Sequence, residues 1–483
     1  MDLNACPFLN PCINTSSGAA APPRDDLLPE AGPLGTFGAV IGHDGSGAPL
    51  PGIGPYDFSA ATRVPDAVPP DRAGNAVRMS LTQQAHASQY VVKACPSAWH
   101  AAQAWLASRL FGALGLATPT AILVKGCSQA FDGTQAPERI YLATTYLPVY
   151  RHLGDWLEGD AAWRVIEGSH DDPIQAASLE RTRADAREAG QQMANVLAQA
   201  GHKPFPSLEG AAARAYAEAL RRRNDTRGVL CGALPAVYQC ALERQYVAAL
   251  WLGNRDLCNV FMENIGVWRD KNDLPCMMTV DFDTCLDLGL QGTLKDEGHE
   301  VALGQRQCLA SLSSSPSSSP SSSSPALRST FRRDAACFGA TLPPGALADL
   351  TQFPYGEHYA PFVRRLAGLA RDVPNRTVLD ELKNPTSVRA LAAEMAYRLG
   401  RISAQEVRPW VESARDVAGG ESSAAKAPLR DSEAFVNHLL TRRDSLVQLL
   451  GGTWAAQAWA HAYPMRARAI DAQQEPFGHQ AGA

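Results

Sequence analysis

One stretch, residues 252–289, constrains the fold of this chain more than any other. It begins with a hydrophilic loop that carries Asn254, Asp256 and Asn259. Two short apolar segments follow, separated by a polar turn, and their length and composition predict two strands. The sequence therefore predicts a polar loop followed by a pair of short strands.

Acidic side chains follow the second of these strands directly. The second strand is expected at residues 277–280, Met-Met-Thr-Val, and Asp281 and Asp283 come immediately after it. Together with the loop they form a set of carboxylates and amides that suits Mg²⁺, a hard cation that takes oxygen ligands. Phosphoryl transfer needs such a set, with one Asp for the acceptor hydroxyl and others for the metal ion. We take phosphoryl transfer as the working hypothesis.

The composition limits the possible partners. The chain has 483 residues, 45% of them hydrophobic, and a net charge of −5. This length predicts two to four domains with substantial cores. No basic surface or polybasic run is expected, so nucleic acid and anionic lipid are not predicted as partners.

The cysteines and the hydrophobic segments argue against a zinc-binding protein and a membrane-spanning protein. The eleven cysteines are scattered and form no C-x-x-C pairs with a second matching pair. We therefore expect reduced, buried thiols rather than a zinc site. No standard signal peptide and no run of eighteen apolar residues is present, so a membrane span is not expected.

A lysine on an apolar strand is the second notable feature. The chain has seven lysines and 37 arginines, and Lys93 lies in a predicted β-branched strand at residues 88–94. A compact ammonium group can contact phosphates in a way that arginine does not reproduce. The alternative is a lysine at a sheet edge, with its stem packed and its charge in water.

The elements around Lys93 predict a small β-containing lobe. Residues 1–78 are rich in Pro, Gly and Ser and are predicted to be disordered. The lobe, residues 79–150, contains the strand with Lys93, a helix, two more strands and an extended connector. The helix is expected at 98–114, the strands at 118–126 and after 138, and the connector at Tyr146-Leu147-Pro148.

The rest of the chain is predicted to be mostly helical, which makes the fold class α+β. A second lobe spans 151–455 and contains a low-complexity Ser/Pro insertion at 311–325. A peripheral tail is expected at 456–483. The predicted helices are polar ones within 160–227, a buried one at 234–252, and amphipathic ones at 350–371, 387–399, 404–414 and 431–450.

Three motifs in this order resemble an atypical kinase group that contains the HipA-type bacterial kinases, actin-fragmin kinase and the phosphoinositide kinases. The motifs are the lysine strand with its following helix, the loop LGNRDLCNVFM and the strand end VDFD. The similarity covers about residues 85–290, less than half of the chain. It implies a two-lobed kinase-like fold that transfers the γ-phosphate of ATP with the help of Mg²⁺.

The resemblance also implies roles for single residues. Lys93 resembles the lysine that contacts the ATP phosphates, and Asp256 resembles the catalytic-loop Asp. Asn259 and Asp281 resemble the two metal-binding residues. Tyr146 and Leu147 would then lie beside the adenine base.

Two departures from the family pattern leave a catalytically inactive member of the family as an alternative. The helix acid that pairs with the strand lysine should fall near residues 102–104, where only Gln103 is polar. Asn259 also follows Asp256 by three positions instead of four or five, so Asn254 or Asp283 would share the metal ion. Both departures also suit a pseudokinase that binds a partner.

The long N-terminal region resembles that of bacterial effector proteins exported by specialised secretion systems. This resemblance implies a host-cell protein as the substrate. The alternatives are a cytoplasmic protein, a kinase of a small molecule or lipid headgroup, and a helical interaction protein in which residues 252–289 form an ordinary hairpin. The sequence gives no prediction of the oligomeric state.

Overall fold

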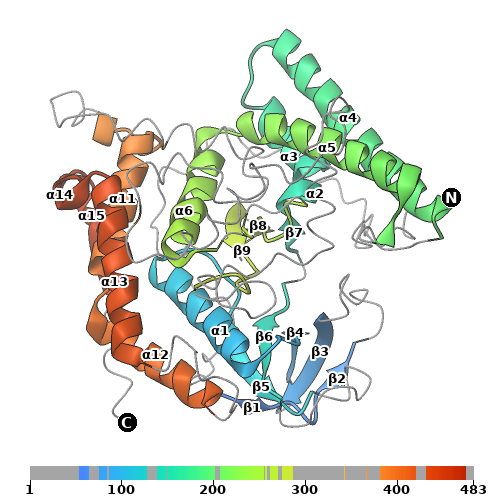
Figure 1. Ribbon diagram of the computed structural model, residues 1–483. Coiled ribbons are helices and arrows are strands. Elements are labelled where there is room, and N and C mark those ends of the chain that lie inside the picture. Colours follow the sequence, from blue (N-terminus) through green and yellow to red (C-terminus); the bar gives the residue numbers. More distant parts are fainter. Residues whose placement is uncertain are drawn as a thin grey trace, which may run out of the picture.

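The protein combines a curled six-stranded sheet, a smaller sheet and many helices (Figure 1). The α+β class predicted from the sequence is therefore confirmed. This computed structural model describes residues 54–64, 76–83, 86–127, 139–147, 149–201, 207–254, 256–257, 261–269, 275–286, 342, 366, 381–419 and 431–474.

The six-stranded sheet has the order β1-β5-β6-β4-β3-β2, and only the β1–β5 pair is parallel. The strands are β1 (Tyr56–Asp57), β2 (Thr62–Arg63), β3 (Ala76–Gln83), β4 (His86–Lys93), β5 (Ala121–Lys125) and β6 (Tyr141–Thr145). Three of them begin within residues 1–78, for which the composition predicted disorder. Cross-strand pairing, which the sequence does not display, makes Tyr56–Asp57, Thr62–Arg63 and residues 76–78 part of the sheet.

The two faces of this sheet bury different residues because side chains alternate along a strand. Tyr90 and Val92 pack with Phe58 on one face. Leu123 and Leu142 point to the other face, which is covered by α1 (Ala98–Ala113). Lys93 is the next residue after Val92, so it points to the α1 side.

Helix α1 begins where the sequence predicts it. The Ser97 side chain caps its first turn by accepting from the His100 backbone N–H at 3.2 Å. Gly115 follows the helix with φ +69°, the left-handed conformation that glycine adopts at helix ends. The helix is buried on nearly all sides, as expected for one that is apolar around its circumference.

The predicted strand pair forms part of a second sheet, in the order β7-β8-β9. Its strands are β7 (Arg151–His152), β8 (Ile265–Arg269) and β9 (Pro275–Thr279). A side chain at Gly266 would overlap the Arg151 carbonyl oxygen, so glycine permits the pairing of β7 with β8. A parallel bridge between Ala117 and Met278 joins the segment before β5 to β9.

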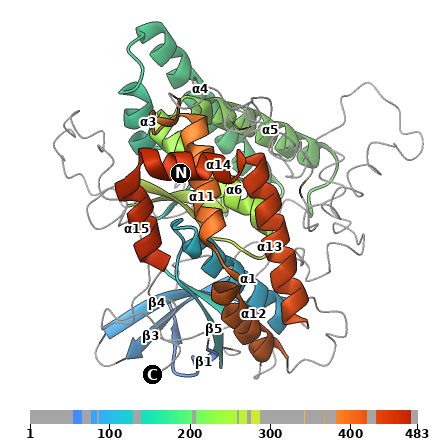
Figure 2. The ribbon, with the colours of Figure 1, turned by 90° about the vertical axis from the view of Figure 1, so that its left-hand side faces the viewer.

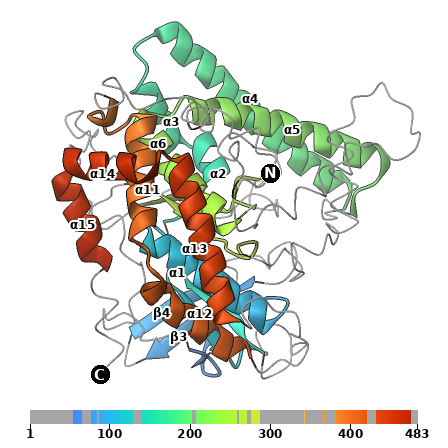
Figure 3. The ribbon, with the colours of Figure 1, turned by 60° about the vertical axis from the view of Figure 1, so that its left-hand side comes forward.

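A pair of long antiparallel helices projects from the molecule (Figure 3). We call α4 (Pro173–Gln199) and α5 (Gly210–Gly232) the helical arm. The short helices α2 (Leu153–Glu158) and α3 (Asp160–Glu167) precede it. The buried Glu158 carboxylate accepts from Arg223 and Arg227 of α5, which fixes the base of the arm.

The C-terminal helices lie together on one side of the molecule (Figure 2). They are α11 (Val388–Arg401), α12 (Ala404–Ala418), α13 (Ser432–Leu449), α14 (Gly452–Ala462) and α15 (Pro464–Gln474), and they pack around α6 (Ala236–Leu252) and α1. The tail predicted to be peripheral from residue 456 contributes buried side chains, because Trp459 is 1% exposed and Ile470 is 3% exposed.

Two predicted segments fall on residues outside the described ranges. They are the Ser/Pro insertion at 311–325 and, apart from Leu366, the helix at 350–371. Across the part of the chain that is described, no helix has both the length and the apolar character needed to cross a membrane.

Candidate active site

The centre of the site is an ion cluster between the two sheets. The Lys93 Nζ atom lies 3.0 Å from Asp281 Oδ2 and 2.5 Å from Asp283 Oδ2. These side chains are 26%, 29% and 11% exposed, respectively. The structure thus brings together residues that lie 188 positions apart along the chain. It places Lys93 on the inner face of the sheet, not at a solvated edge.

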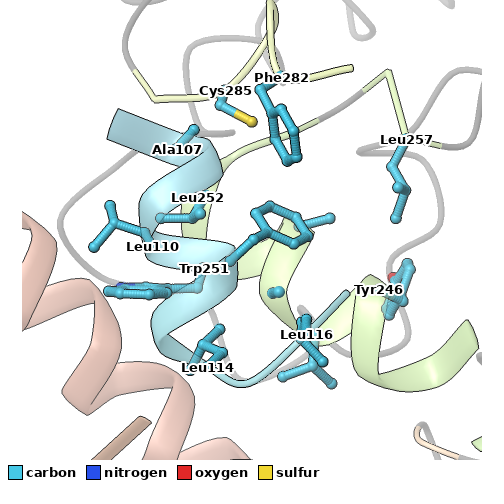
Figure 4. Packing of buried hydrophobic residues seen from close by; sticks show 14 of the residues in the cluster. Ala107, Leu110, Leu114, Leu116, Tyr246, Trp251, Leu252, Leu257, Phe282 and Cys285 are labelled. Carbon is cyan, nitrogen blue, oxygen red and sulfur yellow. The ribbon is translucent and has the colours of Figure 1, made fainter. Parts of the chain in front are cut away.

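The acidic turn after β9 is shaped by its own residues. The Asp283 N–H donates to Asp281 Oδ1 at 3.1 Å, which orients the first carboxylate. Phe282 points into the hydrophobic core (Figure 4). Its ring packs edge-on against Phe111 of α1, with ring centroids 5.2 Å apart. Because Phe282 is 1% exposed, its burial holds the flanking aspartates on the Lys93 side.

His100 is a site residue that the sequence analysis missed. Its Nε2–H donates to the Asp283 carbonyl oxygen at 2.6 Å, and its side chain is fully buried on α1. The sequence signal was weak, because one histidine in an apolar helix has no distinctive spacing. The bond ties α1 directly to the acidic turn.

Asp256 belongs to a turn that is bonded to the acidic segment. Helix α6 ends at Gly253 with φ +63°. Asn254 Nδ2 then donates to the Asp281 carbonyl oxygen at 3.1 Å. The Asp256 N–H donates to Thr284 Oγ1 at 3.2 Å, and Asn264 Nδ2 donates to Asp256 Oδ2 at 2.6 Å.

The role of Asn254 is therefore visible in its contacts. Its Oδ1 accepts from the Thr284 hydroxyl at 2.9 Å, while its Nδ2 is used by the Asp281 carbonyl. These bonds occupy both ends of the amide and fix the Asp256 turn against the acidic turn. Asn254 thus connects the two turns by hydrogen bonds.

Electrostatics divide the carboxylates into two kinds. Burial works to raise the pKa of Asp281, but the charge and hydrogen bond of Lys93, together with hydrogen bonds from Asp283, hold the pKa below its ordinary value. Burial and the neighbouring Asp281 charge raise the pKa of Asp283 to about 6. Burial, again with the Asp281 charge, raises the pKa of Asp256 to about 7. Asp256 is thus poised to exchange a proton near neutral pH.

Lys93 stays charged in this setting. Burial alone would lower the pKa of the ammonium group, but Asp281 and Asp283 outweigh it and raise the pKa well above its ordinary value. Neither partner comes from α1. The α1 position at which the sequence lacks an acid, Gln103, is buried, and neither of its amide atoms has a hydrogen-bond partner in the described structure.

The predicted connector runs from the large sheet to the small one. The Tyr146 N–H donates to the Gln89 carbonyl oxygen at 2.9 Å, and its ring lies 3.8 Å below the Arg78 guanidinium. Leu147 instead joins an apolar cluster with Met278 and Trp268 between the sheets. Of the two predicted connector residues, Leu147 therefore lies on the side of the acidic turn.

The predicted metal ligands are only partly described. Asn259 lies outside the described residues, so its prediction stays a prediction. Within the described ranges, no group of three or more His, Cys, Asp or Glu side chains is arranged to hold a metal ion. Asp283 Oδ1 is nevertheless buried without a hydrogen-bond partner in the described structure. An unsatisfied carboxylate oxygen beside a second carboxylate fits a divalent cation.

Comparisons with known proteins do not add to this geometry. No protein-family model, curated protein or solved structure matches this chain. A function must therefore be inferred from the residues themselves.

Proposed function

We propose that the protein is an ATP- and Mg²⁺-dependent phosphotransferase with an atypical, two-lobed kinase-like arrangement. The six-stranded sheet with α1 would form the small lobe, and the small sheet with the remaining helices would form the large lobe. The observation that carries the proposal is the contact of Lys93 with Asp281 and Asp283. A strand lysine and two strand-end carboxylates meet at the junction of two sheets, as phosphoryl transfer requires.

The nucleotide contacts follow from this arrangement. Lys93 would contact the phosphates, and Leu147 would lie beside the base because it continues the connector into the apolar cluster. Asp281 and Asp283 would hold Mg²⁺, with Asn259 as the further ligand implied by the sequence. When bound, Mg²⁺ would neutralise charge on the phosphate oxygens.

Asp256 would act on the acceptor. Its pKa of about 7 allows the carboxylate to take the proton of an acceptor hydroxyl near neutral pH. The acceptor oxygen would form its bond to the γ-phosphorus while the bond to the bridging oxygen of ADP breaks. Asn264, which donates to Asp256 Oδ2, would hold the carboxylate in place.

The acceptor class we propose is a hydroxyl on a protein. The Pro-, Gly- and Ser-rich composition of residues 1–78 supports export by a specialised bacterial secretion system, and hence a host protein as substrate. This part of the proposal rests on composition, and a cell extract provides its test.

A second candidate is a pseudokinase scaffold, which one observation favours. Both carboxylates that would hold the metal ion are paired with Lys93, and α1 offers it no acidic partner. A lysine held in this way could stabilise the fold without contacting phosphate. Nucleotide binding without phosphate transfer would be the signature of this alternative.

The test is phosphate transfer by matched variants of the full chain. We would incubate the wild type and Asp281→Asn with Mg²⁺ and γ-labelled ATP, with and without a eukaryotic cell extract. Asp225→Asn is the control, because Asp225 is an exposed carboxylate on α5 of the helical arm, paired with Arg221 one turn away on the same helix. We expect labelling by the wild type and the control, and at least a hundredfold less with Asp281→Asn.

The outcomes separate the candidates. Label that appears only with extract supports a host substrate or activator. Equal labelling by the wild type and Asp281→Asn overturns the assignment of Asp281. Mg²⁺-dependent ATP binding with no labelling in any condition replaces the kinase with the pseudokinase.

A further inference from the structure

A buried arginine of the C-terminal helices contacts the end of α6. Arg442 on α13 is fully buried. Its Nη2 donates to the Leu250 carbonyl oxygen at 2.7 Å, and its Nε donates to the Trp251 carbonyl oxygen at 2.8 Å. In return, Trp251 Nε1 donates to the Leu439 carbonyl oxygen at 3.0 Å. Helices α6 and α13 are therefore joined by bonds in both directions.

These bonds complete the last turn of α6. The final carbonyls of a helix have no partners within the helix, and a cation near them is favourable. Ala249 O accepts from the Asn254 N–H, and Leu252 O accepts from the Leu286 N–H at 2.6 Å. Arg442 donates hydrogen bonds to the two carbonyls between them, those of Leu250 and Trp251. The start of the Asp256 turn is thus fixed from α13 as well as from the acidic turn.

A second buried arginine does the same for α1. Arg398 on α11 donates through Nη1 to the carbonyl oxygen of Leu114, the residue that ends α1, at 2.8 Å. Glu394 orients it through a contact of 2.8 Å and also accepts from Arg244 of α6 at 2.9 Å. One ionic group therefore links α1, α6 and α11.

The position of the acidic turn depends on both helices. Helix α1 contacts it through His100 and through the Phe111 ring. Helix α6 contacts it through the Leu252 carbonyl and, one residue past Gly253, through Asn254. Figure 4 shows side chains of both helices converging below Phe282 and Cys285. A shift of either helix would move Asp281 and Asp283 relative to Lys93.

We propose that Arg442 is a positioning residue of the candidate active site, and that Arg398 supports it by fixing α1. The C-terminal helices α11–α13 are then part of the functional unit, although within the described residues they form no hydrogen bond or ion pair with Lys93, Asp281 or Asp283. Arg442 acts through the last turn of α6 and the Asn254–Asp256 turn. Its catalytic consequence rests on the proposed function, whereas its effect on the turn does not.

The test measures backbone hydrogen exchange in the full chain. In Arg442→Met, peptides covering residues 250–257 and 281–286 should exchange about tenfold faster or more than in the wild type, because the turn loses its anchor. Peptides from the helical arm should be unchanged. Arg442→Lys keeps the charge but cannot reproduce two directed bonds, so we expect an intermediate rate.

The matched control is the neighbouring Arg443→Met. Arg443 also lies on α13, donates to the Ile402 carbonyl oxygen and pairs with Asp444, but it forms no hydrogen bond or ion pair with α6 in the described structure. It should leave exchange in 250–257 at the wild-type rate. Equal acceleration by both methionine variants, or none with Arg442→Met, overturns the proposal. Should Arg442→Met fail to fold, the comparison of Arg442→Lys with Arg443→Met decides in the same way.

A kinetic arm links the anchor to catalysis. With phosphate transfer established, Arg442→Met should lower kcat by about tenfold or more and raise the KM for ATP by a smaller factor, because the acidic turn shifts while Lys93 and the connector are untouched. An equal loss in kcat with Arg443→Met contradicts a positioning role. With no transfer by the wild type, the proposed function fails and the exchange result still decides on Arg442.

Discussion

Replacing Lys93 by methionine should destabilise the protein in a way that depends on pH. The change keeps an unbranched apolar stem, one atom shorter than that of lysine, and removes the charge that faces Asp281 and Asp283. Two carboxylates then remain in a largely buried site without a cation. Breaking a buried ion pair by removing one partner is strongly destabilising because the remaining charge is uncompensated.

The pH dependence follows from Asp283. In the wild type, burial and Asp281 already raise its pKa to about 6, above that of an unfolded Asp. A carboxyl group with a raised folded pKa favours the folded state most at low pH, and this contribution is lost as pH rises through that pKa. At pH 5 Asp283 is therefore mostly protonated with or without Lys93. Its contribution to the destabilisation caused by Lys93→Met is small at this pH.

At pH 8 the comparison changes. Without Lys93 the pKa of Asp283 rises further, and the folded variant must either keep the proton or carry the uncompensated charge. For each pH unit above the wild-type Asp283 pKa of about 6, the variant loses up to about 1.4 kcal/mol of unfolding free energy relative to the wild type. Between pH 6 and pH 8 this additional loss is about 2–3 kcal/mol. Asp283 is 11% exposed, so solvent screening does not remove this effect.

The assay is urea unfolding at pH 5 and pH 8 in EDTA, followed by circular dichroism. Lys125→Met is the matched control, since Lys125 is an exposed lysine on β5 of the same sheet. We expect Lys93→Met to lose about 2–3 kcal/mol more stability at pH 8 than at pH 5, and the control to lose equally little at both. A loss that is equal at both pH values, or greater at pH 5, refutes the reasoning.

Three further predictions concern other parts of the molecule. Phosphate transfer should fall as pH drops through 7, where Asp256 becomes protonated, and a pH–rate profile with no acidic limb between 6 and 8 would exclude it as the base. Gln103→Leu should raise the free energy of unfolding by about 1–2 kcal/mol, because it removes buried amide atoms that lack partners; urea unfolding with a lower midpoint than the wild type contradicts this. Glu158→Gln should cost about 3 kcal/mol, because Arg223 and Arg227 lose their buried carboxylate and keep only the more exposed Asp155 as an acidic partner in the described structure. Limited proteolysis should then cleave the helical arm faster; an unchanged cleavage rate would show that the arm does not depend on this group.

Local patterns predicted the elements around the site well. The strand that ends at Lys93, the helix after it and the strand that precedes Asp281 were predictable from the sequence, because each is favoured by its own residues and caps. Their contact across 188 positions was an expectation from resemblance alone, since no local rule relates two distant strand ends. With the structure known, side-chain alternation along β4 explains the contact of Lys93 with Asp281, because the alternation directs Lys93 toward α1 and the acidic turn.

The missed features depend on contacts between distant segments. Strand β3 lies next to a Pro- and Gly-rich region and is recognisable only through its pairing with β4. His100 and Arg442 looked like ordinary polar residues of helices, because their partners are backbone carbonyls that carry no sequence signal. The buried role of Trp459 was missed for the same reason, as its neighbours come from other segments of the C-terminal block.

Calorimetric titration of ATP into the full chain, with and without Mg²⁺, tests the central claim most directly. The site of Lys93, Asp281 and Asp283 should bind ATP in the presence of Mg²⁺, and Lys93→Met should weaken this binding by about tenfold or more while Lys125→Met leaves it unchanged. Equal affinity of the wild type and Lys93→Met, or no ATP binding by the wild type at all, would contradict the account.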